Sequence, residues 1–142
     1  MSQSAVDPTR AQFDAFKGLD RDAPIDMLNL VRLRSIARYG AEHSGPVRSG
    51  AQAYEEYARQ SGPVLARAGG QIVWRGTFQG VLIGPDTETW DICFIARYPS
   101  AHDFLAMISD PAYKAAVVHR QAAVQTSRLI RCAPQPAGET FG

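Results

Sequence analysis

The sequence has few features that would tie the protein to a metal, a nucleic acid or a membrane. Its 142 residues include two cysteines, Cys93 and Cys132, and three histidines, and none of these stands at metal-ligand spacing. The formal net charge of +1 provides no bulk attraction to nucleic acid or to an anionic membrane. We therefore expect no metal, no cofactor, no nucleic-acid partner and no membrane association.

Long apolar runs and catalytic motifs are also absent. No run approaches the roughly 20 apolar residues that span a bilayer, and the N-terminus has no apolar signal core. Scarce cysteine fits a reducing compartment, so we expect a cytoplasmic protein. The chain lacks a Gly-rich phosphate loop, an H-E-x-x-H motif, a CxxC pair and a nucleophile elbow. Motifs therefore name no reaction, and whether the protein is an enzyme stays open.

The apolar periodicity that is present defines a set of helices and strands. Hydrophobic residues make up 45% of the chain and charged residues 20%, as in one globular domain. Pro63 lies inside a helical pattern and predicts a kink or a break there. The predicted elements are a helix at 7–17 begun by Asp7-Pro8, a strand at 25–36, a helix at 49–68 capped by Ser49, strands at 71–83 and 90–98, helices at 100–108 and 110–124, and a strand at 127–132.

This order predicts an α+β, ferredoxin-like antiparallel sheet with strand order 4-1-3-2 and helices on one face. Residues 1–23 would be an N-terminal helical extension, 24–132 the ferredoxin-like domain and 133–142 a flexible tail. The second face of the sheet is apolar and nothing in the chain is left to cover it, so we expect a homodimer formed by the sheet faces. Asp in place of Phe94, or of another third-strand aromatic facing the partner, should then break the dimer.

Several segments together carry a family resemblance. They are MLNLVRLR at 27–34, the helix segment Tyr54-Glu-Glu-Tyr57-Ala, ARAGGQIVWRG, LIGP, ARYPS and FLAMISDPAYKAAVVHR. Over residues 24–131 the chain resembles domain of unknown function 1330, whose members are similar to the dimeric α+β barrel superfamily. The resemblance implies two ferredoxin-like protomers packed sheet to sheet, each with a cleft between sheet and helices. It brings no activity.

Three residues are candidates for catalysis. Asn29 is an amide in the most apolar strand, where it must find hydrogen-bond partners either in the protein or in a ligand. His119 lies on an alanine-rich helix stripe and is either a base near the cleft or a histidine bonded to a backbone carbonyl. Tyr98 ends the third strand and could place its hydroxyl at the cleft mouth. We expect Asn29 and His119 to open onto one cavity.

Three further residues are candidates for substrate binding. Arg32 and Arg128 could bind a carboxylate, although strand-end arginines are more commonly solvated. Trp74 is a strand aromatic that either contacts a ligand or packs in the sheet or dimer interface.

One comparison within the superfamily tests haem chemistry. Haem-degrading and quinone-forming members use an Asn on the first strand, a Trp ending the third and a His in the last helix. Asn29 matches the first position, but Tyr98 and Val117 stand at the others. His119 is two residues further on, about 200° around the helix. The comparison therefore argues against haem degradation.

These observations support two hypotheses. The first is a dimer that binds a small, partly apolar molecule in each cleft and could act on it without a cofactor. The alternative is a non-enzymatic structural or ligand-binding dimer whose cleft is filled by its own side chains.

Overall fold

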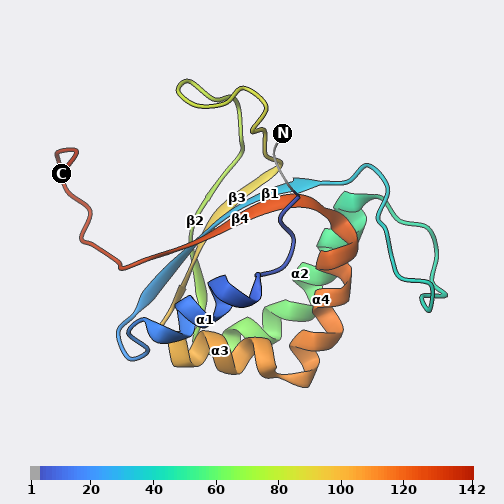
Figure 1. Ribbon diagram of the computed structural model, residues 1–142, viewed down its shortest axis with the longest axis horizontal. Coiled ribbons are helices and arrows are strands. Elements are labelled where there is room, and N and C mark those ends of the chain that lie inside the picture. The colour runs from blue at the N-terminus through green and yellow to red at the C-terminus, as the bar shows by residue number, and fades with distance from the viewer. Residues whose placement is uncertain (1–3) are drawn as a thin grey trace.

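A computed structural model describes residues 4–142. A four-stranded sheet forms one layer and the helices form the other (Figure 1). Every neighbouring pair of strands is antiparallel and the order is β2-β3-β1-β4, so the predicted ferredoxin-like α+β fold is confirmed. The elements are α1 (Arg10–Gly18), β1 (Ile25–Leu33), α2 (Gly50–Arg67), β2 (Gln71–Gly76), β3 (Ile92–Tyr98), α3 (Ala101–Ser109), α4 (Pro111–Ala123) and β4 (Val124–Cys132).

Side-chain caps fix where most helices begin. The Ser49 hydroxyl accepts from the Gln52 N–H while the Gln52 side chain accepts from the Ser49 N–H, which makes a complete capping box for α2. Ser100 caps α3 in the predicted place, and Asp110 caps α4 ahead of its first-turn proline. The predicted start of the first helix was wrong, because Thr9 caps α1 in place of Asp7.

Helix α2 continues through Pro63, so the predicted break does not occur. A proline removes one backbone hydrogen bond and frees the carbonyl of the residue four positions earlier. Pro63 and Arg59 are both exposed, so water can satisfy that carbonyl.

Two predicted strands are shorter in the structure. The first strand ends at Leu33, and Ile36 forms only an isolated bridge with Ser49. The second ends at Gly76, well before residue 83, because the chain ahead of β3 binds β1 instead. There the Asp91 N–H donates to the Val31 carbonyl, and the Asp91 carboxylate accepts from the Leu33 N–H, both at 2.7 Å.

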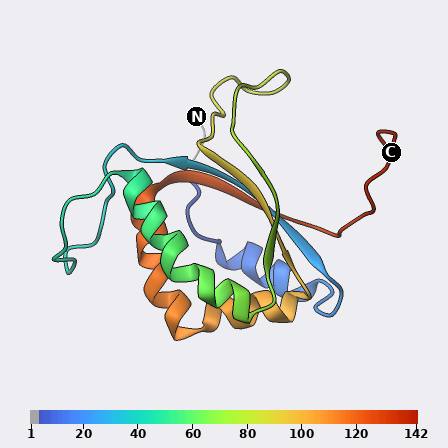
Figure 2. The same cartoon turned by 180° about the vertical axis from the view of Figure 1, so that it is seen from behind.

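The segment between β2 and β3, residues 77–91, forms a long loop. It rises from the sheet on the side away from the helices (Figures 1 and 2). Leu82 and Ile83 in this loop are 98% and 93% exposed. Residues 133–142 contain no helix or strand. No helix in residues 4–142 has the length and apolarity needed to cross a membrane.

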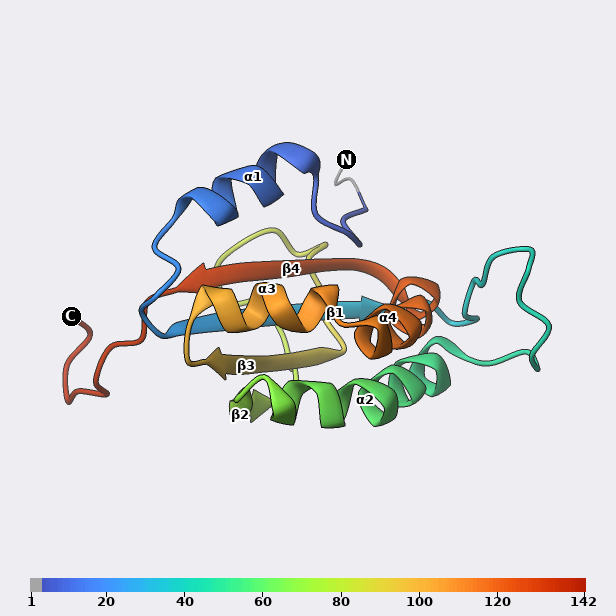
Figure 3. The same cartoon turned by 90° about the horizontal axis from the view of Figure 1, so that it is seen from below.

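The two sheet faces have different roles. Ile25, Met27 and Val31 of β1 alternate toward the helices and are almost fully buried. The register places Tyr98 opposite Ile25 and Ala96 opposite Met27, so these residues share that inner face. Seen from below, α2, α3 and α4 lie across the inner face and α1 lies beside β4 (Figure 3). The outer face carries the alternate residues of each strand.

Candidate functional site

A cavity of about 950 Å³ lies between the inner face of the sheet and the helices. The centre of its floor comes from alternate residues of β1 and β3, where Met27 pairs with Ala96 and Asn29 pairs with Phe94, and residues of β2 and β4 also line the cavity. Because side chains on paired strands alternate in step, these four point to the same side of the sheet. Tyr98 continues the row at the end of β3 and is 5% exposed.

Asn29 is a polar residue at the centre of this floor. Its side-chain N–H donates to the Met27 carbonyl on the same strand at 3.0 Å. Within residues 4–142 its amide oxygen accepts no hydrogen bond. The local bond fixes the orientation of the amide, and the oxygen is the half that a bound molecule could engage.

Three tyrosines line the helix side of the cavity. Tyr54 and Tyr57 come from α2 and Tyr113 from α4. The hydroxyls of Tyr57 and Tyr113 lie 2.9 Å apart. Burial, followed by the neighbouring Tyr57, raises the pKa of Tyr54 and of Tyr113, so both phenols stay protonated at neutral pH.

The N-terminal segment closes part of the cavity along β4. Residues 5–8 and three α1 side chains line it. The Ser127 N–H donates to the Ala5 carbonyl at 2.7 Å, and Arg120 donates to the Val6 carbonyl at 2.6 Å. The Arg131 guanidinium lies 4.9 Å from the centre of the Phe16 ring. Apart from the apolar face of the short helix, no pattern in the sequence indicates that this extension belongs to the site.

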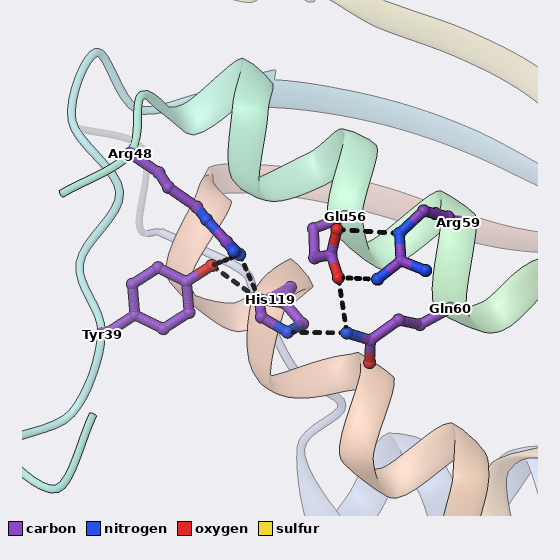
Figure 4. A network of polar contacts seen from close by, with 6 residues as sticks. All are labelled: Tyr39, Arg48, Glu56, Arg59, Gln60 and His119. Carbon is purple, nitrogen blue, oxygen red and sulfur yellow. Dashed lines mark hydrogen bonds and ion pairs between the residues drawn. The ribbon is translucent and has the colours of Figure 1, made fainter. Parts of the chain in front are cut away.

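His119 is not among the residues that line the cavity. It lies in a polar network between α2, α4 and the loop that precedes α2 (Figure 4). Its Nδ1 is 2.6 Å from the Tyr39 hydroxyl and 3.3 Å from an Arg48 nitrogen, and its Nε2 is 3.2 Å from the Gln60 amide nitrogen. A neutral imidazole, with one N–H and one acceptor, can bond to both Tyr39 and Gln60.

The network continues along α2. Gln60 also donates to the Glu56 carboxylate at 2.7 Å, and Arg59 donates to the same carboxylate at 3.0 Å. These bonds hold the pKa of Glu56 well below its usual range, and the bond from Arg59 has the largest effect. The structure therefore brings Asn29 and Tyr98 to one cavity and keeps His119 outside it.

Arg32 does not line the cavity, whereas Arg128 is among its lining residues. Both lie on the outer face, where their guanidinium carbons are 5.8 and 5.3 Å from the ring centre of Trp90. Arg32 donates to the Thr89 carbonyl at 2.9 Å, and Arg128 pairs with Glu88 at 3.3 Å. The two arginines thus hold the base of the loop 77–91.

Trp74 also lies on the outer face. A register shift between Ile72 and Trp74 in β2 places Ile72 beside Ala96 and Trp74 beside Ile95, on opposite faces of the sheet. Trp74 is 49% exposed and does not line the cavity.

The comparisons with known proteins identify the family. The family model described as "Domain of unknown function (DUF1330)" matches residues 48–131. The chain belongs to this family. No curated protein matches it.

The chain is also similar to solved structures. A crystal structure of a protein of unknown function from Rhodopseudomonas palustris is 51% identical, with a TM-score of 0.88, covering 95% of this chain and 100% of that one. The methylated form of that protein is also 51% identical, with a TM-score of 0.89, and the match covers 97% of this chain and 100% of that one. A dimeric protein of unknown function with a ferredoxin-like fold from Bacteroides fragilis is 14% identical, with a TM-score of 0.48. That match covers 80% of this chain and 98% of the other.

The His119 network of this DUF1330 protein predicts a dependence of stability on pH. The pKa of His119 is lowered, first by burial and then by the Arg48 guanidinium. Glu56 opposes this shift, and His43 and Arg59 add to it. The unfolded chain, with a histidine pKa of about 6.5, takes up the proton first as the pH falls. The free energy of unfolding should therefore fall from about pH 6.5 downward, until the pH passes the folded-state pKa.

Urea unfolding at about pH 8 and about pH 5 tests this window. Wild type should lose stability on acidification, and His119→Gln, which cannot titrate, should lose less. Equal losses in the two proteins would contradict the assignment.

Proposed function

We propose that this protein binds a small, partly apolar molecule in the cavity between its sheet and its helices. The supporting observation is the cavity itself, whose volume of about 950 Å³ is within the range of sites for drug-sized ligands. Its floor of Met27, Phe94 and Ala96 is apolar, and Asn29 and Tyr98 add polar groups to it. A purely structural protein with a filled cleft would not need this space.

Asn29 and Tyr98 are the proposed ligand contacts from the sheet. The Asn29 amide oxygen accepts no hydrogen bond within the described chain, and the Tyr98 ring is held edge-on against Phe104, with centroids 5.2 Å apart. His119 is left out of this proposal as a base because it does not line the cavity and lies in the polar network with Tyr39 and Gln60. Arg32 and Trp74 are left out because they do not line the cavity. Arg128 lines it but is also left out, because its guanidinium contacts Trp90 and pairs with Glu88 at the base of the loop 77–91.

A fluorescent probe tests whether the cavity accepts an apolar molecule. N-phenyl-1-naphthylamine is neutral and brightens in apolar surroundings, and we expect saturable binding with one site per chain. Ser61 lines the cavity from α2 and is half-buried, so Ser61→Phe should fill the space and weaken binding about tenfold or more. Ala66→Phe is the matched control, because Ala66 is exposed on the same helix and does not line the cavity.

Two results would contradict the proposal. One is a wild-type protein that does not bind the probe. The other is equal binding by wild type and Ser61→Phe, which would place the probe elsewhere on the protein.

We further propose that the protein forms a homodimer through the outer face of the sheet. Leu28, Leu30 and Ile95 lie on this face, together with Trp74 and Ile130, which are 49% and 45% exposed. Contiguous apolar surface of this kind marks an interface in a globular protein. The loop 77–91 rises on the same side and carries exposed Leu82 and Ile83 toward the space that a second copy would occupy.

A further inference from the structure

Four tyrosine side chains converge on the cavity and their hydroxyls are only partly used by the protein. Tyr54, Tyr57, Tyr98 and Tyr113 all line it. The rings of Tyr54 and Tyr57 are 5.4 Å apart between centroids, and those of Tyr57 and Tyr113 are 6.1 Å apart. The four residues come from α2, β3 and α4, so the fold gathers them from distant parts of the chain.

The hydrogen bonds of these hydroxyls leave donors free. Tyr57 and Tyr113 share one bond, so one hydroxyl of that pair keeps its proton for another acceptor. Within residues 4–142, no hydrogen bond involves the hydroxyl of Tyr54 or of Tyr98. These two residues are 9% and 5% exposed, yet neither oxygen is sealed from solvent. Both residues line the cavity, and each keeps a hydroxyl proton that is not donated within residues 4–142.

The charged groups around the cavity favour an acceptor over a donor. Arg120 lines the same cavity and carries a fixed positive charge. The two carboxylates of the lining, Asp7 and Glu55, belong to exposed residues, and Asp7 accepts from Gln121 at 3.2 Å. The lining thus offers neutral O–H donors and the positive charges of four arginines, Arg75, Arg120, Arg128 and Arg131, while its two carboxylates belong to exposed residues.

We propose that this tyrosine wall, defined as Tyr54, Tyr57, Tyr98 and Tyr113, selects a molecule with an apolar ring body and an oxygen acceptor, above all a carboxylate. The inference rests on the proposed function, because it names the chemical class of the ligand for the same cavity. Phenol O–H groups form strong hydrogen bonds to an anionic oxygen, and the charge of Arg120 adds to this attraction. An ammonium group on the same ring body would meet the arginines of the lining and no buried carboxylate.

Three naphthalene probes that differ in one substituent test the selection. Calorimetric titration of the full chain would compare 2-naphthoate, 2-methylnaphthalene and 2-naphthylmethylammonium. We expect 2-naphthoate to bind about tenfold or more tightly than 2-methylnaphthalene, as charged hydrogen bonds imply, and the ammonium probe to bind most weakly.

Tyrosine-to-phenylalanine variants remove the hydroxyl and keep the ring. Tyr54→Phe and Tyr98→Phe should each reduce the preference for 2-naphthoate by about tenfold and leave 2-methylnaphthalene binding unchanged. Tyr39→Phe is the control, because Tyr39 does not line the cavity. Equal binding of the three probes, or an unchanged preference in both variants, would overturn this inference and leave the proposed function standing. Binding of none of the three would count against the proposed function itself.

Discussion

Replacing Gly50 with alanine is expected to lower the free energy of unfolding by about 3 kcal/mol, at the upper end of the usual cost of overpacking. Gly50 is buried at the start of α2, and its N–H donates to the Ser35 carbonyl at 3.2 Å. A Cβ built there would lie 1.9 Å from the Arg34 carbonyl oxygen, which belongs to the backbone and cannot swing away. The chain leaving β1 or the first turn of α2 must therefore shift.

Gly62 in the same helix provides the matched control. A Cβ at Gly62 meets nothing within 4 Å, and the residue lies on an exposed part of α2. Gly62→Ala should raise the free energy of unfolding by about 0.8 kcal/mol, because alanine has the higher helix propensity. Urea unfolding at a single protein concentration measures both effects. A Gly50→Ala protein as stable as wild type would contradict the close approach of the two backbones.

The sequence predicted the elements best where their signals are local. Ser49 with Gln52, Ser100, and Asp110 with Pro111 mark helix starts through side-chain bonds within one turn, and the structure places the helix starts there. The strand ends were predicted less well, because pairing decides them. Val81, Leu82 and Ile83 have the composition of a strand, but no neighbouring strand extends far enough to pair with them.

The site was predicted in part for a similar reason. Alternation along β1 and β3 depends only on the period of two, so Asn29 and Tyr98 could be assigned to the cavity side. Predicting the position of His119 would have required knowing how α4 is rotated about its own axis. Val117 lines the cavity, and a residue two positions later lies about 200° around the helix, toward α2 and the loop before it. The roles of Arg32 and Arg128 depend on Trp90, which a long loop brings between them.

The position of Phe94 also changes how the homodimer should be tested. Phe94 pairs with Asn29 and lines the cavity, so Asp at this position would damage the inner face of the sheet and not a dimer interface. Its neighbour Ile95 points the other way and pairs with Leu28 and Trp74 on the outer face. Ile95 is therefore the third-strand residue whose replacement reports on the interface.

Ile95→Asp is expected to convert the protein from a dimer, of twice the 15.5 kDa chain mass, to a monomer. In a monomer the new carboxylate would lie on an open sheet face and stay hydrated. In the proposed dimer it would be buried without a partner, which should cost about 3 to 5 kcal/mol of the free energy of dimerisation. That cost exceeds 1.4 kcal/mol, which corresponds to a tenfold change in the dissociation constant. Light scattering at micromolar concentration measures the mass directly.

Val118→Asp is the matched control for this experiment. Val118 is 44% exposed on α4, in the helix layer, so the same change of chemistry there should leave the dimer intact. A wild-type protein that scatters as a 15.5 kDa monomer would contradict the dimer proposal, and a dimeric Ile95→Asp protein would place the interface elsewhere. Because the cavity lies on the opposite face of the sheet, an Ile95→Asp monomer should still bind N-phenyl-1-naphthylamine. Loss of binding on dissociation would mean that the cavity needs the partner subunit to hold its shape.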